Sequence, residues 1–502
     1  MPERGPAAGS GPSGVDSGSP VLGAGLPGVR QLLRTALPLV AAMSGTAIML
    51  FCDRMMLAQY EAAAIAAAVP AGLAAFASLT FFLGTAVYAQ TFIAQFTGAG
   101  RLQDSGPMVW QGLYIALAAG LLLAGLSHLA EPLFALIGHP PLVQAYEASY
   151  FQILTGGAVF TLVARVGGTF WGGRGRTLFV MYQGLCGAAL NILFNYLLIF
   201  GHGGFPELGI CGAALGSIAA EAVVAVVTLV LLWRRRYRQR FNTFPRRSFR
   251  PELMRRLWRF GAPHGVHFFL DLMSFTVFVQ LIGRLPGHMV RGGANIQEAA
   301  NIVLSLNLVS FLPMVGLGQA TAILVGQAVG AGDVPRACRQ VSLARWVAMS
   351  YMVAITLFYV LYPQPLLALF ERSDDLAQVA TLHLARQLLW FVCAWQLFDA
   401  LWIVHFSALQ GAGDTRFAMW MSIIIGWCGF VVPVGIAYAM GASLWTLWSL
   451  LVVYVMLGTV IFSWRYRQGA WKRMSLVSAA DRPAPSVASQ PLPAVVETLS
   501  TP

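Results

Sequence analysis

Long apolar runs separated by short polar segments follow one another along most of the chain. Each run has at least the roughly 20 residues that a helix needs to cross the hydrocarbon core of a bilayer. The pattern therefore predicts twelve membrane-spanning helices, at residues 33–57, 66–97, 107–130, 143–171, 176–200, 208–233, 256–284, 298–328, 338–370, 380–410, 416–440 and 443–465. The two ends, residues 1–29 and 468–502, are rich in Gly, Pro, Ser and Ala, which is typical of disordered tails.

The composition narrows the class of protein. The 502 residues are 57% hydrophobic and only 10% charged, whereas soluble domains carry about 25% charged residues. We therefore expect an all-α polytopic membrane protein. The net charge of +12 would suggest nucleic-acid binding if the positive residues covered a soluble surface. Most of them lie instead in short loops between the apolar runs, so we expect no nucleic-acid partner.

The positive residues also orient the chain. Lysine and arginine gather in the cytosolic loops of membrane proteins, and with twelve spans both termini share the side that carries most of them. An Arg-rich linker, residues 234–255, joins the sixth and seventh spans and begins a block of eleven arginines from Arg234 to Arg259. We expect both termini to be cytosolic in the inner cell membrane. Binding of anionic lipid headgroups is a second role that this block suits.

Three short segments recur in the same order in the two halves of the chain. The pairs are "RTALP" (34–38) with "RFGAP" (259–263), "AQFTGAG" (94–100) with "GQAVGAG" (326–332), and "GRGRTLFVM" (173–181) with "GAGDTRFAM" (411–419). The offset between partners grows only slightly from the first pair to the third, as small insertions in a duplicated sequence produce. We predict two six-helix lobes, 30–233 and 256–467, related by a pseudo-two-fold axis along the membrane normal. Transporters place their substrate sites at such repeat interfaces, so the duplication favours alternating-access transport.

Four acidic residues fall inside the predicted spans: Asp53, Glu221, Asp271 and Asp399. An acid at the bilayer centre costs about 2.5 to 3.5 kcal/mol on insertion scales and therefore marks a candidate functional site. With a rise of about 1.5 Å per residue, the last three lie roughly 18 to 20 Å from the cytosolic boundary, and Asp53 lies nearer the outer side. We predict a candidate cation site in each lobe, with Asp271 and Asp399 sharing one pocket in the second.

These acids also have structural interpretations. Asp53 adjoins Arg54 and can be half of an interfacial ion pair, while Glu221, an additional acid, can be a neutral interhelical hydrogen-bond donor. Asp271 and Asp399 lie in otherwise apolar helices, where a functional role is favoured. Apart from Na⁺ at these two aspartates we expect no metal and no cofactor, because the six cysteines are scattered without zinc-ligand spacing.

Two histidines precede Asp271 in the same span. His264, His267 and Asp271 are spaced i, i+3 and i+7, which places them along one helix face. Histidine titrates near neutral pH, so this row suits a proton relay. Buried histidines that bond a backbone carbonyl are the commoner arrangement, and both interpretations stay open.

Aromatic and sulfur-containing side chains lie near the acids of the second lobe. Trp395 and Trp402 stand four residues before and three residues after Asp399. An aromatic wall beside a carboxylate suits flat organic cations, and Met273 is a candidate for an adaptable substrate lining. Core packing is the alternative for all three side chains.

With these residues assembled, the chain resembles the multidrug and toxic compound extrusion (MATE) family in its bacterial exporter branch, from about residue 30 to about residue 465. The resemblance rests on "ALPLVAAMSGTAIMLFCDRMML" in span one, "AQFTGAGR" after span two, "ALNILFNYLLIFG" in span five, "FGAPHGVHFFLDLMSF" in span seven, "VGQAVGAGD" after span eight and "FDALWIVHFSALQGAGDTRFAM" in span ten. Similar family members carry acids in spans one, seven and ten, which match Asp53, Asp271 and Asp399.

The resemblance implies that these three carboxylates bind the coupling ion. It further implies a V-shaped monomer of two lobes that exchanges Na⁺ or H⁺ for cationic amphiphilic compounds by alternating access. Two departures bear on ion preference and substrate range. Span seven usually has glutamate where this chain has Asp271, and an Ala-His-Gln run near the start of span eight is replaced by Ala-Ala-Asn at 299–301.

Three other functions compete with the transport of cations. A flippase for a lipid-linked precursor shares the two-lobed architecture but needs a basic cavity, whereas acids line both lobes here. An intramembrane enzyme needs a nucleophile or metal constellation, and the sequence has no H-E-x-x-H or G-x-S-x-G motif. A non-transport membrane scaffold is the remote alternative. We therefore predict a multidrug efflux transporter, not an enzyme, with small cationic or amphiphilic molecules and membrane lipid as its partners.

Overall fold

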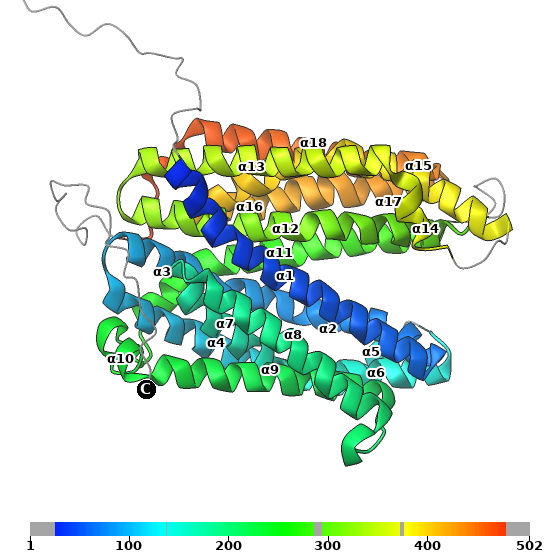
Figure 1. Ribbon diagram of the computed structural model, residues 1–502, viewed down its shortest axis with the longest axis horizontal. Helices are drawn as coiled ribbons and strands as arrows, with labels where there is room; N and C mark the ends of the chain where they lie inside the picture. Colours follow the sequence, from blue (N-terminus) through cyan, green and yellow to red (C-terminus); the bar gives the residue numbers. More distant parts are fainter. Residues whose placement is uncertain (1–25, 137, 286–293, 372–375, 478–502) are drawn as a thin grey trace, which may run out of the picture.

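The computed structural model of the chain describes residues 26–136, 138–285, 294–371 and 376–477, and every regular element within these ranges is helical (Figure 1). The helices of the first half are α1 (Leu26–Tyr60), α2 (Ala62–Val87), α3 (Ala89–Gly98), α4 (Ser105–Leu126), α5 (Ala130–Ala135), α6 (Pro141–Gly156), α7 (Ala158–Gly173), α8 (Thr177–Phe200) and α9 (Gly209–Trp233). Those of the second half are α11 (Pro251–Gly283), α12 (Ile296–Gly330), α13 (Val334–Leu361), α14 (Pro363–Ala368), α15 (Leu376–Ala412), α16 (Thr415–Met421), a π-helical segment (Ser422–Val431), α17 (Val432–Ala439) and α18 (Leu444–Gln468). A short helix, α10 (Arg235–Phe241), lies in the Arg-rich linker.

The helices provide the twelve predicted membrane spans. Eleven segments of the described chain are each long and apolar enough to cross a bilayer. The twelfth span is the pair α6 and α7, which is bent by 44° and separated by Gly157. The predicted all-α polytopic fold is therefore confirmed.

The spans form two bundles that lie one above the other in Figure 1. Helices α1 to α9 make the N-lobe, and α11 to α18 make the C-lobe. Helix α1 begins and α18 ends at the same end of the molecule, the end at which α10 also lies, and we call this the proximal end. The lobes lie close together there and diverge toward the distal end, where α5, α6 and α14 are found.

Helix α1 is shared between the lobes. Its first half packs Leu32 and Leu39 into the C-lobe core formed by α12, α13 and α15, whereas Leu57 packs into a core of the N-lobe. Figure 1 shows the resulting diagonal course from one lobe to the other. Because the same helix carries Asp53 near its distal end, the position of this acid depends on both lobes.

Glycines allow the lobes to approach closely near the proximal end. A Cβ on Gly84 of α2 would stand only 2.8 Å from Gly265 Cα of α11. Gly98 of α3 and Gly330 of α12 each lie against the backbone of the other helix, where a Cβ would collide with it. Close helix crossings through small residues are characteristic of membrane proteins, since lipid tails provide no hydrophobic drive for association.

Large apolar side chains remain exposed over both bundles. Leu121, Val226, Val460 and Trp390 are each more than half exposed. Contiguous apolar surface of this kind is rare on soluble proteins, and a bilayer covers it at no cost. The exposed apolar surface is thus the outward face of the predicted spans.

The C-terminal tail is shorter than the sequence predicts. Residues 469–477 belong to the expected tail, yet Ala470–Arg473 forms a 3-10 turn and Trp471, Leu476 and Val477 are buried in the helical cores. Burial of this segment is favourable because it carries three large apolar side chains close together. The polar residues between them interrupt the hydrophobic pattern by which a buried segment is recognised in the sequence. At the other end α1 already begins at Leu26, and the rest of both expected tails lies outside the described residues.

Candidate functional site

The N-lobe acid is held by an amide network. Asn195 Nδ2 of α8 donates to Asp53 Oδ1 of α1 over 2.7 Å and to Asn191 Oδ1 over 3.2 Å. Asn191 Nδ2 in turn donates to Ser217 Oγ of α9 over 2.8 Å. Asp53 therefore has an uncharged direct partner rather than the neighbouring Arg54, whose charge acts on it without a direct bond.

One oxygen of this network has no partner. Asn195 is fully buried, and no described residue bonds its Oδ1. A buried polar atom without a partner calls for an explanation such as a bound ion, and hard cations take oxygen ligands. Asn195 Oδ1 and the Asp53 carboxylate oxygens are each of the ligand type that a small cation accepts.

The position of Asn195 depends on a glycine of the neighbouring helix. A Cβ on Gly216 of α9 would overlap Asn195 Oδ1 and stand 3.0 Å from the Asn195 backbone nitrogen. Only a residue without a side chain leaves room for the amide there. The N-lobe site therefore needs Gly216 as well as its polar residues.

The C-lobe brings its two acids together around a tyrosine. Tyr454 of α18 donates its hydroxyl to Asp271 Oδ1 of α11 over 3.1 Å. The charges of Asp271 and Asp399 act on one another, and both act on Tyr454. The predicted shared pocket is consistent with this arrangement. Asp271 is exposed and Asp399 is half-buried, so a small cation can reach both carboxyls.

Aromatic rings pack against Tyr454, but Trp395, which the sequence predicts beside the acids, is not among them. The Tyr454 ring stacks on Phe430 with centroids 4.6 Å apart and meets Trp402 edge-on at 5.2 Å. Trp395, by contrast, is only 5% exposed and stacks on Trp448 inside the C-lobe core. The structure contradicts a lining role for Trp395, because its helix face turns toward the core.

Glu221 and Met273 have different outcomes. Glu221 Oε1 of α9 accepts a hydrogen bond from Arg165 of α7 over 3.0 Å, in a partly exposed ion pair. Glu221 thus makes an interhelical contact, as an acceptor from Arg165 rather than as the neutral donor that the sequence suggests, with a partner 56 positions away in sequence. Met273 is half-buried in α11, and its lining role stays a prediction.

The histidine row has separate partners rather than a continuous chain. His264 Nδ1 bonds Gln410 Nε2 of α15 at 2.7 Å, and His267 Nδ1 bonds Ser422 Oγ. Among the hydrogen bonds of the described residues, none joins His264, His267 and Asp271 to one another. Satisfied histidines are the better interpretation of this geometry, and the proton relay remains an untested prediction.

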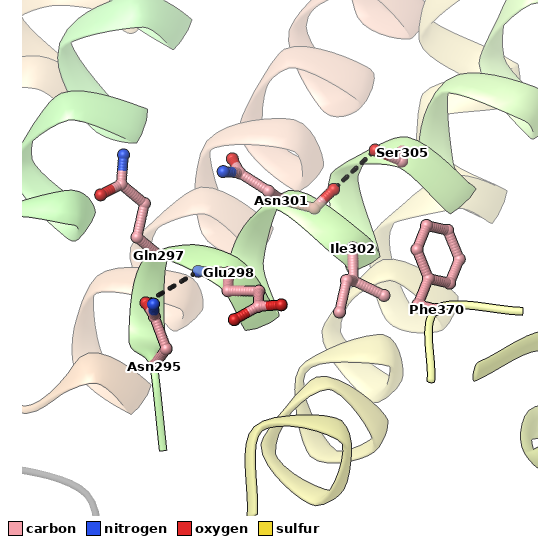
Figure 2. A pocket seen from close by; sticks show the side chains of 7 residues that line it. All are labelled: Asn295, Gln297, Glu298, Asn301, Ile302, Ser305 and Phe370. Atoms are coloured by element: carbon pink, nitrogen blue, oxygen red, sulfur yellow. Dashed lines mark hydrogen bonds between the residues drawn. The ribbon is translucent and has the colours of Figure 1, made fainter. Parts of the chain in front are cut away.

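A separate polar pocket opens at the distal end of the C-lobe. It has a volume of about 440 Å³ and is lined by Asn295, Gln297, Glu298, Asn301, Ile302, Ser305 and Phe370. Figure 2 shows the Asn295 side chain capping the start of α12 through the Glu298 backbone, with the Glu298 carboxylate nearby. Asp53, Asp271 and Asp399 are not among the residues that line this pocket.

Sequence reasoning missed Asn191, Asn195 and Tyr454. All three are polar residues inside apolar spans, and the two asparagines are spaced i, i+4 on one face of α8. Polar side chains within membrane helices usually bond across helices, so a search for amides and hydroxyls besides acids would have identified them. Their partners would still have been unknown.

A surface that suits a bilayer, two six-helix lobes and acids within the spans define a two-lobed membrane transporter rather than an enzyme. A family model described as MatE matches residues 38–197 and 263–439. These matches cover most of both lobes, and the chain belongs to this family. They begin at Pro38 and Pro263, the prolines that end the first pair of repeat segments.

Proteins with sequences similar to this chain are named multidrug resistance proteins. Multidrug resistance protein PmpM of Pseudomonas aeruginosa is 30% identical over 432 residues, which cover 83% of this chain and 85% of PmpM. The probable multidrug resistance protein NorM of Rhizobium meliloti is 28% identical over 457 residues, which cover 90% of this chain and 95% of that protein.

Solved structures show the same fold. An outward-facing multidrug resistance MATE family transporter of the MOP superfamily has a TM-score of 0.78 at 19% identity and covers 89% of this chain and 97% of its own. A crystal structure of MATE in complex with MaL6 has a TM-score of 0.77 at 20% identity and covers 89% and 98%. The predicted two-lobed architecture is therefore confirmed.

Proposed function

We propose that the protein is a multidrug efflux transporter that exchanges Na⁺ or H⁺ for cationic amphiphilic compounds by alternating access. One observation carries the proposal: each lobe holds a carboxylate within its spans, Asp53 or Asp271, that bonds an uncharged partner. Among the ion pairs of the described residues, none includes Asp53, Asp271 or Asp399. A carboxylate left without a permanent counter-ion in a membrane can bind and release a mobile cation.

The neighbourhood of the C-lobe acids supports organic cations as substrates. Asp271 offers negative charge beside the Tyr454 ring, and Trp402, which is only partly buried, meets that ring edge-on. Cation–π attraction adds about 0.5 to 2 kcal/mol for each well-placed ring. Substrate and coupling ion then compete for the same carboxylates, which makes exchange obligatory.

A lipid-linked precursor is the less favoured substrate. Such a molecule carries pyrophosphate and needs positive charge within the spans. Arg165, a basic residue inside a span, already pairs with Glu221, which neutralises it. The charges of the described site therefore favour a cation.

We further propose that the protein lies in the inner cell membrane with its proximal end facing the cytosol. Both termini are then cytosolic. The Arg-rich linker lies at this end (Figure 1), as expected for positive residues on the cytosolic side. Each chain contains both acid sites, so we expect a monomer to be sufficient for transport.

Helix α10 is anchored to the N-lobe by one arginine. The Arg174 guanidinium lies 3.8 Å from the Phe241 ring centroid and 4.7 Å from that of Phe170. Burial lowers the pKa of Arg174 to about 10, so it stays protonated at neutral pH and keeps its attraction to the rings. The anchor holds the remaining arginines of α10 at the proximal surface.

Arg240 of α10, together with Arg246 of the linker and Arg101 after α3, suits anionic lipid headgroups. A pocket of about 400 Å³ is lined by Arg101, Arg240 and Arg246, together with Asp104. We expect anionic lipid in vesicles to raise the melting temperature, and the double variant Arg240→Gln/Arg246→Gln to lose most of this gain. Exposed Arg339 of α13 provides the control Arg339→Gln, and an equal loss in both proteins would contradict lipid binding at α10.

Transport by purified protein in proteoliposomes tests the main proposal. Efflux of ethidium is measured with a sodium gradient and a pH gradient imposed separately. We expect Asp271→Asn and Asp399→Asn to abolish efflux driven by one of the two gradients, and Asp53→Asn to reduce it. Glu252→Gln, an exposed acid at the start of α11, is the control and should transport normally. Wild-type efflux by both C-lobe variants would overturn the proposal.

A further inference from the structure

Two glutamines join the lobes at the proximal end. Gln95 of α3 is fully buried and donates its Nε2 to Gly411 O over 2.9 Å and to Ala412 O over 3.3 Å, at the end of α15. Gln327 of α12 donates its Nε2 to Gly173 O over 3.1 Å, at the end of α7. Each lobe thus gives one amide to a carbonyl of the other.

The two bonds are copies of each other under the internal repeat. Gln95 and Gln327 are the second residues of the matched segments "AQFTGAG" and "GQAVGAG". Their acceptors, Gly173 and Gly411, are the first residues of the third matched pair, "GRGRTLFVM" and "GAGDTRFAM". A pseudo-two-fold axis between the lobes therefore relates donor to donor and acceptor to acceptor. Packing that serves only one lobe would not create this reciprocity.

A further contact breaks the symmetry. The backbone N–H of Leu476, in the segment after α18, donates to Gln95 Oε1 over 2.7 Å. The Leu476 carbonyl accepts from Arg256, and the Leu476 and Val477 side chains are buried in the N-lobe core. Residues 474–477, which we call the strap, thereby carry the end of the C-lobe across to the N-lobe. Gln327 has no such contact within the described residues.

We propose that Gln95 and Gln327 form a gate that holds the lobes together at the proximal end, and that the strap strengthens its Gln95 half. The gate has to break for the proximal end to open and re-forms when it closes. The role in a transport cycle rests on the alternating access proposed above. Three amide-to-carbonyl bonds between helices and one from the strap suit such a gate, because each is lost as soon as the lobes separate by a few ångströms.

Spin-label distances test the gate without requiring transport. Labels are placed on Arg176→Cys and Arg336→Cys, two exposed proximal positions in different lobes, in a chain whose six native cysteines are replaced by alanine. We expect a dominant short distance, from the closed proximal end, and a minor long distance. The ratio of long to short populations is compared between variants in proteoliposomes.

The variants separate the parts of the gate. Because one neutral hydrogen bond contributes about a 2- to 12-fold change in equilibrium, Gln327→Leu should raise the ratio by this factor. Gln95→Leu should raise it by about tenfold or more, since it loses the strap contact as well. In Gln95→Glu a buried carboxylate oxygen would face the Gly411 and Ala412 carbonyls that the amide now bonds, so the ratio should rise at least as much as in Gln95→Leu.

Two matched controls exclude general loosening. Gln111 of α4 is equally buried and makes three hydrogen bonds, all within the N-lobe and the linker, so Gln111→Leu should leave the ratio unchanged. Deletion of 476–502 should raise the ratio, whereas deletion of 478–502 keeps Leu476 and Val477 and should not.

The outcomes distinguish this proposal from the proposed function. An unchanged ratio in both glutamine-to-leucine variants, or an equal rise in Gln111→Leu, would overturn the gate. If the ratios change as expected but the wild-type protein does not export ethidium, then the proposed function fails and the gate stands as the contact that controls the lobes.

Discussion

Gly216 provides the sharpest test of the N-lobe site, because Gly216→Ala changes no polar or charged residue. The added Cβ would overlap Asn195 Oδ1 and crowd the Asn195 backbone nitrogen at 3.0 Å. The Asn195 amide has to move away, and its bond to Asp53 is 2.7 Å long. A displacement of roughly 0.8 Å stretches that distance to the limit of a hydrogen bond.

The size of the effect follows from the charge of Asp53. A hydrogen bond to a charged group contributes about 1.5 to 3 kcal/mol, which corresponds to about a 10- to 150-fold change in equilibrium. We therefore expect the half-saturating concentration of the driving cation to shift by at least about tenfold in Gly216→Ala. The assay is ethidium efflux from proteoliposomes at increasing cation concentration.

The matched control is a glycine on the facing helix. A Cβ on Gly187 of α8 would meet Val224 at an ordinary 3.4 Å, so Gly187→Ala should behave as wild type. Asn195→Ala should reproduce the shift, and the double variant Asn195→Ala/Gly216→Ala should add little, because both changes remove one interaction. Wild-type cation dependence in folded Gly216→Ala would refute the role assigned to the Asn195–Asp53 bond.

Four further substitutions test the remaining candidates. Trp395→Ala should lower the free energy of unfolding by about 3 to 5 kcal/mol, because it leaves a cavity in the core. Trp402→Ala should instead alter the substrate range. If both variants lose the same melting temperature and Trp402→Ala keeps the wild-type substrate range, the two residues do not differ in this way. Glu221→Gln should cost about 1 kcal/mol or less, since its ion pair is partly exposed; loss of cation-driven efflux would instead make Glu221 a coupling acid. Tyr454→Phe keeps the ring but removes its bond to Asp271, so cation half-saturation should shift about tenfold or more, and an unchanged value would show that the bond is idle.

The spans and the repeat were predictable, because both are properties of consecutive residues. Twelve apolar runs specify twelve spans, and recurring segments specify two lobes. The depth of a residue in the membrane was also predictable, by counting from the end of its span, and this identified the acids as intramembrane residues. Partners across helices were not: Asp53 and Asn195 are 142 positions apart, and only the packing of α1 against α8 brings them together.

Helix rotation limited the rest of the site prediction. Trp395 and Trp402 are about equally near Asp399 in sequence, yet one faces the C-lobe core and the other meets Tyr454. The packing of the segment after α18 was unpredictable for a similar reason, because its three buried side chains at 471–477 lie among polar residues. In both cases the environment of a residue depends on elements that its local sequence does not specify.

The two lobes repeat their mechanical contacts but not their acids, which predicts how the acids combine. At the offset that relates Pro38 to Pro263, Asp53 corresponds to Phe278 and Asp271 to Thr46, so neither carboxylate has a counterpart. Asp271 bonds Tyr454, and the charge of Asp399 acts on both groups, whereas Asp53 bonds Asn195 in the other lobe.

Residues that share partners couple by about 0.5 to 3 kcal/mol, whereas independent sites add within about 0.5 kcal/mol. Double-variant cycles measure the cation concentration that half-saturates efflux, and they use Asp→Glu variants so that some efflux is retained. The shifts caused by Asp271→Glu and Asp399→Glu should be non-additive. The pair Asp53→Glu and Asp399→Glu should be additive. Equal coupling energies in both cycles would mean that the three acids act as one site. Contacts between the lobes would then have to connect Asp53 to Asp399.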